Sequence, residues 1–153
     1  MTNDEATVKM QRYCAYQDRC HQEVRYKLVS LKVYGDQLEQ VMSQLIQDGY
    51  LSDERYARSF ARGKYRMKKW GKLRIQRELK AKQISVYCIK KALAEIDEEG
   101  DYLETLEEVL RKYQAKRVDK YDAYALRQKT YQHALSKGFE PELIGKGLDK
   151  LSI

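Results

Sequence analysis

With 153 residues, 35% of them charged and only one proline, the chain has the material of one ordinary domain or of a short array of small repeats. No apolar run approaches the roughly 20 residues that span a bilayer, and the N-terminus lacks the apolar core of a signal peptide. We therefore expect a cytoplasmic protein without a membrane partner. The three cysteines include no CxxC pair and only two histidines accompany them, so we expect neither a disulfide framework nor a metal site.

The formal net charge of +7 is concentrated in the middle of the chain. Residues 55–91 hold fourteen Lys and Arg against a single acid, Glu78. Residues 1–54 hold six bases and nine acids, and residues 92–153 hold ten bases and thirteen acids. We call residues 55–91 the basic stretch. A positive field confined in this way indicates a polyanionic or acidic partner.

Three amphipathic helices are predicted before the basic stretch. The first covers residues 4–17, the second residues 18–34 and the third residues 36–49. The third begins with a capping-box pattern of Asp36 and Glu39. The predicted core faces of the second and third helices contain Cys20, Val24, Leu28 and Leu31, and Leu38, Val41, Met42, Leu45 and Ile46.

Two further helices are predicted inside the basic stretch. Ser52 can cap the first, residues 53–69, whose first turn holds Asp53 and Glu54. The second covers residues 72–82 and turns apolar residues inward and bases outward. The predicted inward residues are Tyr56, Ala57, Phe60, Ala61, Met67, Ile75 and Leu79, and the first helix carries a basic stripe of Arg55, Arg58, Arg62, Arg66 and Lys69.

Four helices are predicted after residue 84, with a hinge at residues 98–100. They cover residues 85–97, a segment that begins at Asp101, residues 121–137, and a last helix that Pro141 opens. Glu104 completes a capping-box pattern at the second of them. Their predicted faces contain Val86, Ile89, Leu93 and Ile96; Leu103, Leu106, Val109, Leu110 and Tyr113; Tyr124, Gln128, Tyr131 and Leu135; and Leu143, Ile144, Leu148 and Leu151.

A faint internal repeat runs through these helices. The residues around Ile84, followed by Ile89 and Leu93, match those around Phe139, followed by Ile144 and Leu148. Residues 31–34 stand in the same relation to Val41 and Leu45, with a slightly different turn. The predicted fold class is therefore all-α, with three tandem three-helix repeats, residues 1–51, 52–98 and 99–153, in an elongated, curved array.

The middle repeat resembles the signature of the RecX family of recombination regulators. The matching residues are Gly-Tyr-Leu-Ser-Asp-Glu-Arg-Tyr-Ala at 49–57, then Arg62, Arg66, Gly71, Ile75, Glu78, Leu79, Lys82 and Ile84. The chain departs from the family at Gln83, where a glycine is usual, and at Tyr56, where phenylalanine is common. The resemblance implies the same three-repeat architecture and no enzymatic activity. It also implies a partner, because RecX-like proteins lie in the groove of the RecA filament on single-stranded DNA and inhibit the recombinase.

The chemistry of the chain gives no independent sign of catalysis. It contains no Ser/His/Asp order worth proposing, no Gly-rich phosphate loop and no HExxH motif. Asp53 and Glu54 are explained by their place at a helix start. We therefore expect no enzyme and no cofactor.

The basic stripe can be a solvated face or a binding surface. Like charges four residues apart along Arg58, Arg62 and Arg66 cost a few tenths of a kcal/mol each, and a sequence selected only for stability would interleave acids. A partner that neutralises them is the simpler explanation. The predicted binding residues are Arg55, Arg58, Arg62, Arg66, Lys68, Lys69, Lys72, Arg74, Arg77, Lys80 and Lys82, with Tyr65 and Trp70 able to stack on unpaired bases.

Two functions follow from these observations. The first, which the resemblance favours, is a regulator that binds the RecA filament on single-stranded DNA and inhibits its recombinase and ATPase activity. The second is a stand-alone nucleic-acid-binding helical module without sequence specificity, in which the same bases contact phosphates directly. The sequence leaves open how the bases divide between protein and phosphate contacts. We expect a monomer.

Overall fold

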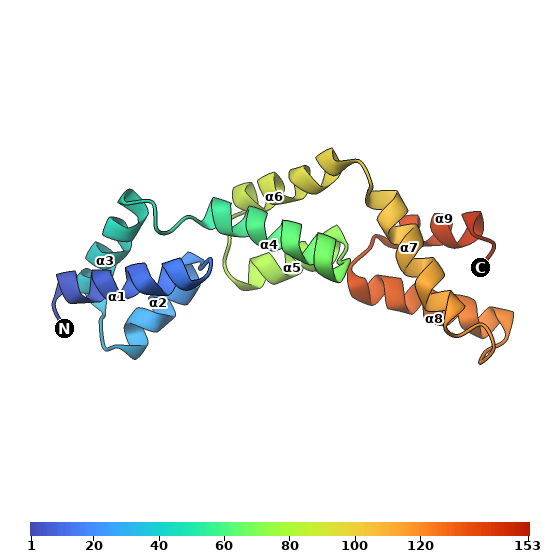
Figure 1. The fold of residues 1–153 in the computed structure, drawn as a ribbon, viewed down its shortest axis with the longest axis horizontal. Coiled ribbons are helices and arrows are strands. Elements are labelled where there is room, and N and C mark those ends of the chain that lie inside the picture. The colour runs from blue at the N-terminus through green and yellow to red at the C-terminus, as the bar shows by residue number, and fades with distance from the viewer. The chain divides into compact units, whose positions relative to one another are not determined.

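The computed structural model describes residues 1–153 and contains nine α-helices and no strand (Figure 1). The all-α fold class predicted from the helical periodicity is confirmed. None of the helices combines the length and the apolar character that crossing a membrane requires. In chain order the helices are α1 (Asn3–Tyr16), α2 (His21–Ser30), α3 (Gly35–Gln47), α4 (Asp53–Lys68), α5 (Lys72–Ala81), α6 (Val86–Glu99), α7 (Tyr102–Ala115), α8 (Ala123–Lys137) and α9 (Pro141–Lys150).

Internal contacts group the chain into two compact units. The first unit consists of residues 1–59 and 79–91, and the second of residues 60–78 and 92–153. Helices α4, α5 and α6 therefore each contribute residues to both units. The repeat boundaries predicted from the sequence stay a prediction.

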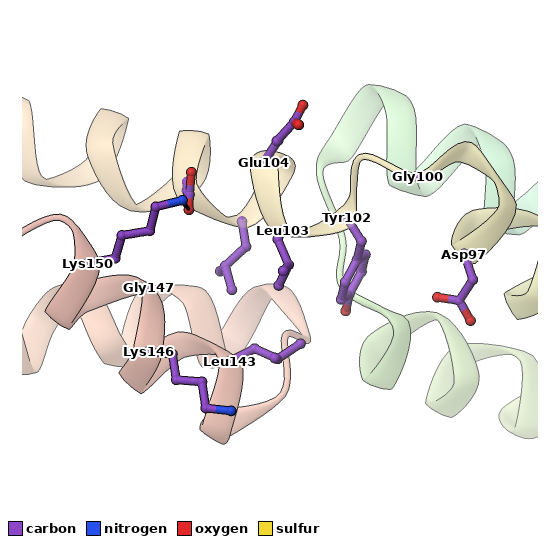
Figure 2. A pocket seen from close by; sticks show the side chains of 11 residues that line it. Asp97, Gly100, Tyr102, Leu103, Glu104, Leu143, Lys146, Gly147 and Lys150 are labelled. Carbon is purple, nitrogen blue, oxygen red and sulfur yellow. Dashed lines mark ion pairs between the residues drawn. The ribbon is translucent and has the colours of Figure 1, made fainter.

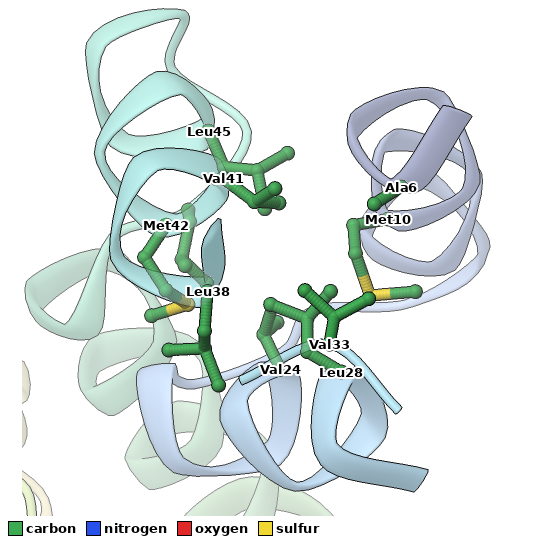
Figure 3. Close-up of a cluster of buried hydrophobic side chains, with 10 residues drawn as sticks. Ala6, Met10, Val24, Leu28, Val33, Leu38, Val41, Met42 and Leu45 are labelled. Atoms are coloured by element: carbon green, nitrogen blue, oxygen red, sulfur yellow. The ribbon is translucent and has the colours of Figure 1, made fainter. Parts of the chain in front are cut away.

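The first unit buries a core between α1, α2 and α3 (Figure 3). Side chains spaced three or four residues apart point to a common centre, because such positions lie on one face of a helix. The sequence predicts Ile46 in this core, but it is 45% exposed, since it lies in the last turn of α3. The core consists of Ala6, Met10, Val24, Leu28, Val33, Leu38, Val41, Met42, Leu45 and Leu51.

The second unit packs α7, α8 and α9 around a core of their own, together with its share of α4, α5 and α6. Its largest fully buried side chains come from both groups of helices, and ring contacts join the groups, because the Tyr102 ring centroid lies 6.0 Å from that of Tyr65 and 5.4 Å from that of Phe139. These side chains are Tyr65, Ile75, Ile96, Leu106, Leu110 and Phe139.

Four apolar residues that the sequence places on core faces are instead exposed. Met67 lies in the last turn of α4, and Val86, Leu103 and Tyr124 lie in the first turns of α6, α7 and α8. Periodicity assigns a residue to a face of its helix, but it does not say where along the helix the packing partner ends. The prediction is wrong for Met67, Val86 and Leu103 because each lies at a helix end. In α8 the predicted face itself is wrong, because Tyr124 and Gln128 are exposed and the buried residues are Leu126, Thr130 and Ala134.

The same helix-ending turn occurs five times, at Gly49 and Ser152 as well as at the three positions of the internal repeat. Lys32, Gln83 and Gly138 adopt left-handed backbone conformations, with φ of 64°, 61° and 100°. In each case the next residue donates a backbone hydrogen bond to the carbonyl oxygen five residues before it, which is the Schellman arrangement. Gln83 thus adopts the conformation for which the family usually has glycine.

This turn corrects the register of the internal repeat. The residue after each left-handed position of the repeat is buried: Val33, Ile84 and Phe139. The turn at Lys32 therefore has the same geometry as the turns at Gln83 and Gly138, whereas the sequence suggests a slightly different one. Counting five and nine residues onward from Val33 gives Leu38 and Met42, both buried, in place of Val41 and Leu45.

Both predicted capping boxes are absent. At the start of α3 no side chain caps the helix, and Glu39 pairs with Arg25 of α2 at 2.6 Å. At the start of α7, Asp101 makes no capping hydrogen bond. Helix α2 is shorter than predicted at both ends: it begins after Cys20, whose backbone N donates to the Glu23 carboxylate at 3.1 Å, and it ends at Ser30, before the turn at Lys32.

Cys20 lies in the core, as the sequence predicts, and is fully buried. Burial raises the pKa of its thiol to about 11, so it stays protonated at neutral pH. All three cysteines are free.

Candidate partner-binding site

Helix α4 begins as the sequence predicts. The Ser52 hydroxyl accepts a backbone hydrogen bond from the first turn at 3.2 Å, and Glu54 pairs with Arg58 at 2.8 Å. Asp53 caps the start of α2, because its Oδ1 accepts a hydrogen bond at 2.8 Å from the backbone N of His21, the first residue of that helix. The acids at the start of α4 therefore stabilise helix starts and a base within the first unit.

In the second unit, acids of α6 lie opposite the bases of α4. Arg62 Nη2 lies 3.1 Å from Glu95 Oε2, and Arg66 Nη2 lies 2.7 Å from Glu99 Oε1. Both the two bases and the two acids are four residues apart, so the two helix faces pair in register.

Lys72, at the start of α5, makes a third pair with α6, at 2.7 Å from Asp97. The basic stripe is therefore interleaved with acids, contrary to the prediction, because α6 supplies them from a distant part of the sequence. All three pairs are partly exposed, so each is worth about 0.2–1 kcal/mol. Like-charge repulsion is relieved within the chain, and it no longer indicates a partner by itself.

Tyr65 does not face a ligand, contrary to the prediction that it could stack on unpaired bases, because it is only 2% exposed. Its hydroxyl donates to Asp101 Oδ1 at 2.6 Å and lies 2.9 Å from Thr105 Oγ1. Burial, together with the Asp101 carboxylate, raises the pKa of Tyr65 well above its usual range. Tyr65 is thus a core residue with a satisfied hydroxyl.

Trp70 is half-buried among cations. The Arg74 guanidinium lies 4.0 Å from a ring centroid of Trp70, the Lys64 ammonium lies 5.0 Å away, and the Phe60 ring meets it at 6.2 Å, edge to face. Arg74 also donates to the carbonyl oxygen of Ser136 at 3.2 Å. A nucleobase that stacked on Trp70 would have to displace one of these cationic side chains. The role of Trp70 in stacking therefore stays a prediction.

The remaining predicted bases differ in their surroundings. Arg55 donates to the carbonyl oxygen of Gly49 at 3.1 Å, and the Lys82 ammonium lies 6.0 Å from the Tyr56 ring centroid. The structure records no ion pair for a further four, of which Lys69 is half-buried and the rest are exposed: Lys68, Lys69, Arg77 and Lys80.

The turn between α4 and α5 packs directly on the turn between α8 and α9 in the second unit. Gly71 N donates to the carbonyl oxygen of Lys137 at 2.8 Å, and Leu73 N donates to that of Gly138 at 3.0 Å. A Cβ atom on Gly71 would lie 2.4 Å from the carbonyl carbon of Gly138. The signature residue Gly71 therefore has a packing role, because only glycine allows this approach.

A pocket of about 610 Å³ lies between α7 and α9 in the second unit (Figure 2). Its lining residues include Leu103 and Glu104 of α7 and Lys146 and Lys150 of α9. Lys150 pairs with Glu107 at 2.7 Å. No group of three or more His, Cys, Asp or Glu side chains is placed to hold a metal ion. None of the predicted binding bases lines this pocket.

The acids of α6 are the part of this site that the sequence analysis missed. The sequence predicts a hinge at residues 98–100, whereas α6 continues to Glu99. A usable signal was present, because the spacing of Glu95 and Glu99 equals that of Arg62 and Arg66.

Comparison with known proteins agrees with this description. Two family models match: RecX, second three-helix domain, over residues 52–93, and RecX, third three-helix domain, over residues 99–147. The Regulatory protein RecX of Lactococcus lactis subsp. cremoris is 29% identical over 142 residues, which are 92% of this chain and 53% of that one. The Regulatory protein RecX of Prosthecochloris aestuarii is 27% identical over 139 residues, 91% of this chain and 88% of that one.

A solved structure shows the same fold. The crystal structure of RecX from Lactobacillus salivarius matches with a TM-score of 0.86 at 24% identity, over 99% of this chain and 97% of that chain. The fold and the two family models together define an all-helical protein built of three-helix domains. The two matched ranges cover more than half of the chain, and the chain belongs to the RecX family. It spans about half the length of the Lactococcus relative.

Proposed function

We propose that this protein binds the RecA filament on single-stranded DNA and inhibits its recombinase and ATPase activity, without catalysing a reaction of its own. Membership of the RecX family supports this, as does the description of its relatives as regulatory proteins. The observation that carries the proposal is a set of exposed bases without ion pairs in or beside the signature helices: Lys68, Arg77 and Lys80. We place its action in the cytoplasm, as a monomer.

The Lys and Arg side chains of the basic stretch differ in how far they are paired with acids. Bases without an acid partner present their full charge to a partner protein. Arg62, Arg66 and Lys72 can bind an acidic or phosphate group only after an acid of α6 is displaced. We therefore propose that the Lys and Arg side chains without an ion pair make the strongest contacts with the partner. Four other basic residues add less: Arg55, Arg58, Arg74 and Lys82.

A stand-alone nucleic-acid-binding module is the second candidate. Exposed lysine and arginine side chains without acid partners suit phosphates as well as the acids of a protein surface. The two functions differ in one requirement, since only the first needs RecA.

The test is inhibition of ATP hydrolysis by RecA on single-stranded DNA. The parent protein should inhibit at amounts well below one per RecA subunit. A basic-stretch variant, Lys68→Gln/Arg77→Gln/Lys80→Gln, should need about tenfold more protein or worse, because three charge contacts are lost while helix propensity is kept.

A matched variant separates contact from net charge. Lys9→Gln/Arg12→Gln/Lys146→Gln also removes two lysines and one arginine, all exposed and without recorded ion pairs. It should inhibit like the parent. A basic-stretch variant that is folded and inhibits RecA as well as the matched variant does would remove these bases from the binding surface. A parent protein that binds bare single-stranded DNA but leaves RecA unaffected would favour the second function.

A further inference from the structure

The acidic C-terminal third contains a basic segment of its own. Residues 111–133 hold seven Lys and Arg against two acids, Asp119 and Asp122. The rest of residues 92–153 holds three bases and eleven acids. The slightly negative total for this third therefore hides a separation of charge between the two ends of α7.

These bases gather around a pair of stacked rings. Tyr113 of α7 and His133 of α8 lie with ring centroids 4.4 Å apart and ring planes at 22°. Two pockets, of about 400 and 180 Å³, share this ring pair. Lys129 lines the larger pocket, and three bases of α7 and its C-terminal end line the smaller one. We call these four bases the α7–α8 cluster: Lys112, Lys116, Arg117 and Lys129.

Most of the charge in the α7–α8 cluster is unpaired. Lys112 pairs with Glu108 at 2.7 Å. The Arg117 guanidinium instead lies 3.8 Å from the Tyr113 ring centroid, and the structure records no ion pair for Lys116, Arg117 or Lys129. Three cations thus converge on one place without an acid to neutralise them, which favours an anionic ligand.

Exposed aromatic rings adjoin the cluster. Tyr124 is 75% exposed and lies one turn before Gln128, which lines the larger pocket. The Lys129 ammonium lies 4.8 Å from the Tyr121 ring centroid. Single-stranded nucleic acid offers the matching chemistry, because its unpaired bases stack on rings while its phosphates meet cations. A duplex presents phosphates but keeps its bases stacked inside.

We propose that the α7–α8 cluster is a second binding site, for single-stranded nucleic acid, in which Lys116, Arg117 and Lys129 contact phosphates and Tyr124 stacks on a base. None of these residues belongs to the basic stretch. The site therefore stands or falls separately from the proposed inhibition of RecA.

The first test measures binding of a labelled oligothymidylate, about 16 nucleotides long, to the full chain across a salt series without RecA. A cluster variant, Lys116→Gln/Arg117→Gln/Lys129→Gln, is compared with the matched variant defined above. The slope of log K against log salt should fall by about 2 in the cluster variant, at about 0.7 per lost phosphate contact. The matched variant should keep the parent slope.

The second test isolates the stacking contact. Tyr124→Ala should bind oligothymidylate about 5- to 150-fold more weakly than the parent. Tyr16→Ala, at a tyrosine that is 82% exposed on α1, should bind like the parent. Inorganic polyphosphate has no bases, so the parent and Tyr124→Ala should bind it equally.

Two results would overturn the proposal. Equal salt slopes for the cluster and matched variants would show that the cluster meets no phosphate. Equal affinities of Tyr124→Ala and the parent for oligothymidylate would remove the single-strand assignment. If the triple variant is unfolded by circular dichroism, the single change Lys129→Gln at an exposed position serves instead, with an expected fall in slope of about 0.7.

Discussion

Two regions of the molecule hold similar basic side chains in opposite electrostatic surroundings. In α4, Arg62 and Arg66 lie 3.1 and 2.7 Å from carboxylates of α6. In the α7–α8 cluster, Arg117 and Lys129 lie against tyrosine rings and have no acid partner. The region that is most basic in sequence is thus partly neutralised within the chain, whereas a cluster in an acidic third is not. The charge offered to a partner depends on pairing in space as well as on density along the sequence.

The largest effect should come from breaking the junction that holds the α4–α5 turn. In Gly71→Ala the new Cβ would lie about 2.4 Å from backbone atoms of Gly138, and two backbone hydrogen bonds would be disturbed. We expect a loss of about 2–5 kcal/mol in the free energy of unfolding, from overpacking and weakened hydrogen bonds. Urea unfolding measures it.

Gly63→Ala is the matched control, because it lies within α4 and a Cβ there meets nothing within 4 Å. It should stabilise the protein by about 0.5–1 kcal/mol, since alanine is the better helix former. Similar unfolding curves for the two variants would show that the Gly71 junction does not form in solution.

Removing the acids that pair with α4 tests whether they cause the difference between the two regions. Glu95→Gln/Glu99→Gln should lower the free energy of unfolding by about 0.4–2 kcal/mol, because two partly exposed ion pairs are lost. It should also free two guanidinium groups and steepen the salt slope of oligothymidylate binding by up to about 1.4.

The control for this change is Glu98→Gln/Glu104→Gln, at exposed acids without recorded ion pairs. Both variants gain the same net charge. Equal salt slopes for the two would contradict the claim that Glu95 and Glu99 neutralise the bases of α4.

The smallest expected effect is a pH dependence at the α7–α8 cluster. Burial, and then the charges of Lys137 and Arg117, lower the pKa of His133 from its ordinary value of 6.5. The other charged and titratable groups that line its pockets are Lys112, Tyr113, Lys116 and Lys129.

Because the folded-state pKa is the lower one, the unfolded state binds more protons as the pH falls below 6.5. The free energy of unfolding should therefore fall between pH 6.5 and the folded-state pKa of His133. His133→Gln should lack this part of the fall, which urea unfolding near pH 7.5 and about pH 5.5 would measure. The same pH dependence in the parent and in His133→Gln would show that His133 titrates normally.

Local signals in the sequence predicted most of the helices. Ser52 caps α4, Gly138 ends α8 in a left-handed conformation, and Pro141 opens α9. These signals act within one or two turns of the chain, so the order of residues is enough to identify them.

The side-chain partners that the sequence did not predict depend on which helices pack against each other. Asp101 has the sequence context of a helix cap, but the buried Tyr65 hydroxyl uses its carboxylate. Glu39 likewise pairs with Arg25 of another helix. Competition between a local and a distant partner is decided by tertiary packing, and for the same reason the ion pairs of Glu95 and Glu99 could not be assigned from periodicity alone.

The central proposal is that Lys68, Arg77 and Lys80, three exposed basic residues without ion pairs in the basic stretch, bind a RecA filament on single-stranded DNA. The most direct measurement is binding of the parent and of the basic-stretch and matched variants to single-stranded DNA, with and without a preformed RecA filament, across a salt series. The account predicts that the filament binds the parent and the matched variant more tightly than bare DNA does. It also predicts that the basic-stretch variant loses most of this filament-dependent gain. Equal filament binding by all three folded proteins would contradict it.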